Sequence, residues 1–157
     1  MQTLSGLQRN IADQKTLTTY LTLLGLVLLY PSMASLYPIL PPLLGLAYVK
    51  WRDALRQGDG FWVVAWMLYA VVFESVWSLP LYGIWALFFV TRYLVEPKVE
   101  YLLHDRRLID IVAAVLFDLL YLAFLAVYGS IMHVQTFDFD LVMLYYLLVD
   151  VAAVVLF

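Results

Sequence analysis

The longest charge-free stretch of the chain constrains its fold more than any other feature. No charged residue occurs from Thr16 to Val49. A single helix of that length would measure roughly 51 Å, well beyond the roughly 30 Å hydrocarbon core of a bilayer. Prolines at positions 31, 38, 41 and 42 interrupt the stretch. We therefore expect two helices with a turn between them, and we expect Pro42 in the first turn of the second helix, where its missing N–H costs nothing.

The remaining apolar stretches predict four more helices. Between Phe61 and Thr91 the one charge is Glu74, and the segment SLPLYG interrupts the stretch with a proline and a glycine. Hydrophobic residues make up 65% of the chain and charged residues 13%, against roughly 45–50% and 25% in soluble domains. We therefore predict a single all-α transmembrane domain over residues 1–157, with six short helices at about 17–30, 40–51, 61–77, 81–95, 109–131 and 141–157. A four-span arrangement, with 17–49 and 61–91 as broken or re-entrant elements, is the alternative.

The positive charges favour six spans. All nine Lys and Arg residues precede the first helix or follow the second and fourth: Arg9, Lys15, Lys50, Arg52, Arg56, Arg92, Lys98, Arg106 and Arg107. The other connections, around 31–39, 78–82 and 132–140, contain none. Because positive charges collect on the cytoplasmic side, the pattern predicts a multi-pass protein with both termini in the cytoplasm. For the stretch after Pro97 there are two alternatives, an amphipathic helix along the inner membrane surface and a solvated loop.

The residue composition disfavours several classes of enzyme, metal-binding and nucleic-acid-binding protein. There is no cysteine, which excludes disulfides, thiol catalysis and cysteine-ligated metals. In the predicted topology His104 and His133 fall on opposite sides of the membrane, so they cannot share a metal ion. The clustered cations do not form a basic face for nucleic acid. We therefore expect no enzyme activity, no catalytic residues, no cofactor and no nucleic-acid partner.

Three acids fall inside predicted spans: Glu74, Asp118 and Asp150. A carboxylate is costly at membrane depth, and no Lys or Arg lies inside a span to neutralise it. We expect neutral acids that hydrogen-bond to groups such as Tyr121, Tyr145 or Tyr146 and hold helices together. A proton or ion path and a contact with a partner helix are the alternatives.

The outer end of the third helix is the candidate partner-binding site. Glu74 lies close to three large aromatic residues, Trp77, Tyr82 and Trp85, beside a Pro–Gly turn. Aromatic anchors around a buried polar contact are typical of the energetic centre of an interface. The alternative is that Glu74 caps the start of the fourth helix.

The layout of motifs resembles one protein family. A proline-led second helix (LPPLLGLAYVKW) is followed by a small basic loop (RQGDGFW), a third helix that ends on an acid and a turn (VVFESVWSLPLYGIW), and a fifth helix with an early Asp (VLFDLLYLAFLAVYG). This pattern resembles the rod shape-determining protein MreD family over residues 17–157. The matching positions are Pro42, Gly60, Phe61, Glu74, Leu79, Pro80, Leu81, Gly83 and Asp118. The family usually has Asp where Glu74 stands, and more glycine in its third helix.

The resemblance implies a non-enzymatic scaffold of the bacterial cell-elongation machinery in the cytoplasmic (inner) membrane. The implied partners are an MreC-like bitopic membrane protein, the MreB filament system, the elongation peptidoglycan polymerase and transpeptidase, and the lipid bilayer. The family's fold is similar to the substrate-binding subunits of energy-coupling-factor transporters. A small-molecule (vitamin) binding subunit of a transporter is therefore the alternative function.

Overall fold

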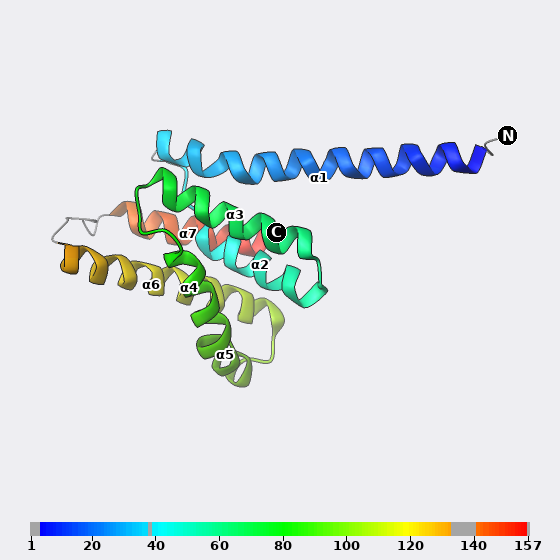
Figure 1. The fold of residues 1–157 in the computed structure, drawn as a ribbon. Coiled ribbons are helices and arrows are strands. Elements are labelled where there is room, and N and C mark those ends of the chain that lie inside the picture. The colour runs from blue at the N-terminus through cyan, green and yellow to red at the C-terminus, as the bar shows by residue number, and fades with distance from the viewer. Residues whose placement is uncertain (1–3, 38, 133–140, 157) are drawn as a thin grey trace.

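The computed structural model describes residues 4–37, 39–132 and 141–156, in which every regular element is a helix (Figure 1). The elements are α1 (Leu4–Leu36), α2 (Leu44–Gln57), α3 (Gly60–Val76), α4 (Gly83–Val90), the π-helical segment η1 (Thr91–Val95), α5 (Glu96–Leu102), α6 (Arg106–Met132) and α7 (Leu141–Leu156). Because α4, η1 and α5 continue into one another, these residues form six helical segments. The predicted all-α fold is confirmed.

The segments alternate in direction. In Figure 1 the α2–α3 turn and the α5–α6 connection lie at one end of the bundle, and the α1–α2 and α3–α4 connections lie at the other. α2 is central and packs against α3, α6 and α7, whereas α1 packs along α3. α4 and α5 diverge from the bundle axis. The Lys and Arg residues from position 50 onward therefore gather at the end that holds the α2–α3 turn.

The predicted bounds of the first helix were wrong at both ends. α1 begins at Leu4 rather than near residue 17, and it continues through Pro31 to Leu36. A proline inside a helix removes one backbone hydrogen bond and crowds the preceding turn. Pro31 is fully buried in the bundle, so tertiary packing retains a helix that the sequence pattern ends at residue 30.

The proline-rich connection from α1 to α2 is held by tyrosine hydroxyls from three different helices. Tyr30 donates to the Pro41 carbonyl at 2.7 Å, Tyr145 donates to the Ile39 carbonyl at 3.1 Å, and Tyr69 donates to the Pro42 carbonyl. Pro42 is not in the first turn of the helix as predicted, because α2 begins only at Leu44. Its place is in the connection, where its carbonyl serves as an acceptor.

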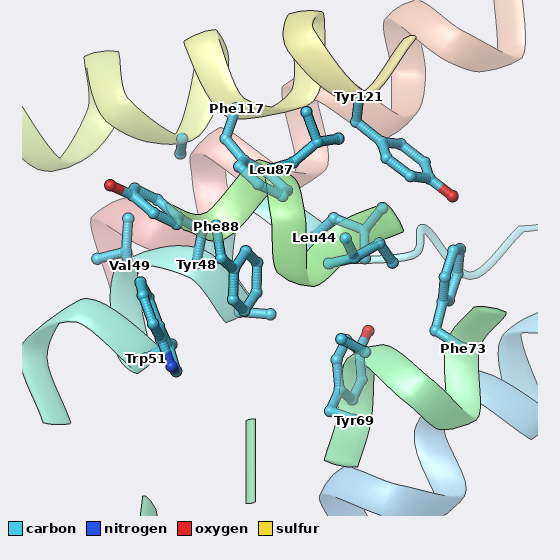
Figure 2. Close-up of a cluster of buried hydrophobic side chains, with 14 of the residues drawn as sticks. Leu44, Tyr48, Val49, Trp51, Tyr69, Phe73, Leu87, Phe88, Phe117 and Tyr121 are labelled. Atoms are coloured by element: carbon cyan, nitrogen blue, oxygen red, sulfur yellow. The ribbon is translucent and has the colours of Figure 1, made fainter. Parts of the chain in front are cut away.

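An aromatic cluster fills the core around α2 (Figure 2). The Tyr48 and Phe117 rings stack with centroids 5.2 Å apart, and Trp51 lies 5.0 Å from Phe88. These four rings come from α2, α4 and α6. The core therefore joins helices that are distant in sequence, and it ties the diverging α4 to the central helix.

One helix, Arg106–Met132, is long and apolar enough to cross a membrane by length and composition. Shorter apolar helices cover Tyr20–Leu36, Gly60–Val76 and Val142–Leu156. The six membrane crossings therefore stay a prediction, whereas the six helical segments are part of the fold.

Candidate functional site

Asp150 on α7 holds the start of α2. Its two carboxylate oxygens accept hydrogen bonds from the backbone N–H groups of Gly45 at 2.7 Å and Leu46 at 2.9 Å. The first N–H groups of a helix have no acceptor within the helix, and the helix dipole favours a negative charge beside them. Asp150 is buried, so its carboxylate provides the hydrogen-bond acceptors that water would provide at the protein surface.

Asp118 on α6 completes this arrangement. A side-chain hydrogen bond joins it to Asp150. Two carboxyl groups form such a bond when one of them carries a proton. Asp150 accepts two backbone N–H groups, whereas Asp118 only shares the one from Gly45, so we assign the proton to Asp118. The two acids, on sequence-adjacent helices, are therefore brought together in a single site.

Gly45 allows the three helices to meet at these acids. A Cβ atom at this position would lie 3.0 Å from the Ala114 side chain on α6 and 3.0 Å from the Asp150 carboxylate. Both distances are tighter than ordinary van der Waals contact. Gly45 was not predicted, because no repeated small-residue spacing marks it in the sequence.

Glu74 on α3 performs the same task for α4. It is buried, and its carboxylate accepts from the backbone N–H groups of Tyr82 at 2.7 Å and Ile84 at 2.5 Å. Gly83 allows this close approach, since a Cβ there would lie 3.3 Å from the Glu74 carboxylate and 2.9 Å from the Phe124 ring. Of the two roles considered from the sequence, the capping role is the one that the geometry gives to Glu74.

Two of the three predicted tyrosines do not hydrogen-bond to the acids. Tyr145 donates to Ile39 instead. The Tyr121 hydroxyl is buried without a hydrogen-bond partner among the described residues. Glu74 and Asp150 bind main-chain N–H groups because α2 and α4 begin within the bundle. For Glu74 this is the capping alternative stated above, whereas for Asp150 it was not predicted.

The predicted aromatic residues surround the turn that Glu74 holds. Trp77 is 36% exposed and Tyr82 is 58% exposed. Trp85 is half-buried, and its indole N–H donates to the Met67 carbonyl at 3.0 Å. The Tyr82 and Trp85 ring centroids lie 5.3 Å apart. Trp77 and Tyr82 are thus presented outward, with the Tyr82 ring against Trp85 and the Trp77 ring stacked on Phe73 at 5.7 Å.

A second buried polar site, at the opposite end of the bundle, was not found from the sequence. Glu96, at the start of α5, is fully buried and interacts with arginines from two elements. Arg56 and Arg92 each approach it at 2.7 Å, and Arg52 lies 3.5 Å away. The Tyr48 hydroxyl also donates to it, at 3.1 Å.

Arg52 links this site to α6. Its guanidinium is fully buried and pairs with Asp110 on α6 and with Asp53. Burial by itself lowers the pKa of Arg52, but the hydrogen bond to Asp110 and the neighbouring carboxylates outweigh it and raise the pKa overall. Arg52 is therefore charged at neutral pH. The four-residue spacing of Arg92 and Glu96 was the one sequence signal for this site.

The π-helical segment turns Glu96 inward. The Glu96 N–H donates to the Thr91 carbonyl, five residues back, and Pro97 has no N–H with which to continue an α-helical ladder. From the end of α4 through η1 into α5, the buried positions are Phe88, Thr91, Glu96 and Val99. The five-residue step from Thr91 to Glu96 places the carboxylate, rather than the Val95 side chain, among the arginines.

The described polar side chains of these sites already interact with other groups of the chain. The described residues contain no group of three His, Asp or Glu side chains that could hold a metal ion. Glu74, Asp118 and Asp150 are engaged with this chain's own backbone or with one another. No protein-family model, curated protein or solved structure matches this chain.

The first prediction concerns the paired acids. Asp150→Asn should lower the free energy of unfolding by about 1–3 kcal/mol, because an NH2 group would replace one of the two acceptor oxygens and face a backbone N–H donor. Asp118→Asn should cost less than about 1 kcal/mol, since its amide can still donate to Asp150. Denaturant unfolding of the purified protein in detergent, followed by circular dichroism, measures both. An equal or larger loss for Asp118→Asn would contradict the assigned donor and acceptor.

The second prediction concerns the buried charge site. Glu96→Gln should destabilise the protein by about 3–5 kcal/mol, because it removes the buried carboxylate that Arg52, Arg56 and Arg92 share. Glu100→Gln is the matched control. Glu100 pairs with Arg56 at the exposed edge of the same site, and its loss should cost about 1 kcal/mol or less. The same unfolding measurement applies, and equal effects of the two changes would refute a buried role for Glu96.

Proposed function

We propose that this chain is a non-enzymatic, multi-pass membrane scaffold of the MreD type, which binds an MreC-like bitopic partner in the bacterial cell-elongation complex. One observation carries the proposal. The turn over residues 77–82, held by the buried Glu74 carboxylate, presents aromatic side chains at the end of the bundle opposite the cations. The MreB filament system and the peptidoglycan polymerase and transpeptidase are the further partners that this proposal implies.

A membrane environment is supported by the apolar surface of the bundle. Large hydrophobic side chains are exposed along α1, α6 and α7, among them Leu26, Leu29, Val127, Leu144 and Leu148. A soluble monomer rarely exposes apolar surface on this scale. Lipid chains would cover these residues at no cost, and the cations gathered at one end fit the positive-inside rule.

A binding role is supported by the fixed shape of the turn. Ser78 has φ +52° and Tyr82 has φ +69°, a left-handed conformation that is uncommon for residues other than glycine. The bond from Tyr82 N–H to Glu74 holds this conformation. A surface that is already ordered loses less conformational entropy on binding. Glu74 thus acts as a positioning residue for the aromatic surface rather than as a contact.

The third prediction is the topology. Single cysteines introduced as Gln57→Cys and Leu81→Cys in this cysteine-free chain should react from opposite sides of the membrane, because both residues are exposed and lie at opposite ends of the bundle. Labelling of intact cells with a membrane-impermeant maleimide should modify the cysteine at position 81 alone. Modification of both positions from outside would overturn the multi-pass arrangement.

The fourth prediction concerns the partner. Trp77→Ala and Tyr82→Ala should reduce co-purification of an MreC-like bitopic protein by tenfold or more, since truncation of an interface anchor typically costs about 2 kcal/mol. Gln57→Ala is the control, because Gln57 is exposed at the opposite end. Circular dichroism verifies that all variants are folded.

Equal recovery of the partner with all three variants would refute the assigned surface. Native mass spectrometry of the same preparation tests the alternative function. A stoichiometric vitamin-sized ligand without a bitopic partner would favour a transporter binding subunit.

A further inference from the structure

The segment from α4 to α5 carries an apolar and aromatic stripe on its outer face. The exposed residues follow one another at helical spacing: Phe89, Val90, Tyr93, Leu94, Lys98, Tyr101 and Leu102. Tyr101 is 84% exposed and Leu102 is 74% exposed. The stripe therefore runs from the bundle to the end where the cations gather.

The buried ion pairs of Glu96 fix the orientation of the outer face of α5. The inner side of α5 is anchored by Glu96, which the arginines of α2 and η1 surround. Figure 1 shows α5 standing away from the bundle, and among the helices it packs against α6. The outer face of α5 is thus held in one orientation and is not covered by another described helix.

The charges near this face are mostly positive. Lys98, Arg106 and Arg107 are exposed around it. The acid Glu100 is paired with Arg56, and Asp105 accepts a hydrogen bond from the Arg107 backbone N–H at the start of α6. Among the described residues, no carboxylate lies within ion-pair distance of the Lys98 or Arg107 side chains.

Tyrosine and leucine beside unpaired cations are the composition of a helix at a membrane–water interface. The aromatic ring and the aliphatic chain enter the headgroup region, and the cations attract anionic lipid, each contributing about 1 kcal/mol near the surface. The stripe continues through Phe89 and Val90 toward the middle of the bundle. A water-soluble partner bound at the membrane surface would not contact these two residues, whereas lipid would.

We propose that α5 and the first turn of α6 form an interfacial anchor that rests on the cytoplasmic leaflet and binds anionic phospholipid headgroups. Tyr101 and Leu102 enter the interface, and the unpaired Lys98 and Arg107 contact lipid phosphates, whereas Arg106 lies 3.7 Å from Asp53. The proposal rests on the membrane location proposed above, and it adds the lipid class that this part of the surface recognises.

The experiment uses the full chain, which has no native cysteine. Nitroxide labels on Leu102→Cys, Leu119→Cys and Gln57→Cys report oxygen and nickel-chelate accessibility in vesicles of phosphatidylcholine with or without phosphatidylglycerol. Leu119 is exposed on the apolar α6 and Gln57 on the α2–α3 turn, so they serve as the lipid and water references. We expect the label at 102 to be shielded from nickel relative to the label at 57, and more strongly when phosphatidylglycerol is present.

Charge removal supplies a second measurement. Lys98→Gln with Arg107→Gln should weaken the preference for spin-labelled phosphatidylglycerol over phosphatidylcholine by about fivefold per charge removed, while leaving the helix content unchanged. An unchanged lipid preference would overturn the proposal.

The accessibility results separate this proposal from the membrane location. Nickel accessibility at 102 equal to that at 57, with 119 still in lipid, would overturn the anchor alone. Shielding of 102 with spin–spin broadening, which marks a contact between two copies, would overturn it as well. Nickel access at 119 would instead overturn the membrane location on which the anchor rests.

Discussion

A helix that begins within an apolar bundle has N–H groups that neither its own carbonyls nor bulk water can satisfy. α2 and α4 both begin this way, and both are completed by a carboxylate from another helix. The contact from Asp150 to Gly45 joins residues far apart in the sequence and closes α7 onto the centre of the bundle. The positions of the short helices, and of the turns before them, depend on these two acids.

The opposite end of the bundle is organised by charge pairing rather than by capping. Glu96 reaches the arginines of α2 because the π-helical segment rotates it inward. The same rotation directs Lys98, Tyr101 and Leu102 outward. A single irregularity in the backbone thus links the most polar part of the interior with the surface that we assign to anionic lipid.

The two ends suit different partners. At one end, Glu74 holds a turn with exposed aromatic rings and no nearby Lys or Arg, which suits a helix of a membrane partner. At the other, cations surround an exposed stripe, which suits lipid headgroups. Both surfaces are held by buried carboxylates, Glu74 for the aromatic turn and Glu96 for α5. In each case a buried acid determines which side chains are exposed.

The sequence by itself determined the number of helical segments, the place of the α3–α4 turn and the grouping of Lys and Arg at one end. These follow from local properties, namely apolar runs, proline and glycine, and the order of charges along the chain. The sequence also identified Glu74, Asp118 and Asp150 as the acids to explain.

Only the tertiary structure decided what those acids bind, that Gly45 is a point of close approach, and that Glu96 is buried. The continuation of α1 through Pro31 was also a tertiary outcome. The physical reason is common to all of them. Each depends on which atoms of a distant helix come within about 3 Å, the range of a hydrogen bond, and a pattern of residue types along one chain carries no record of that distance.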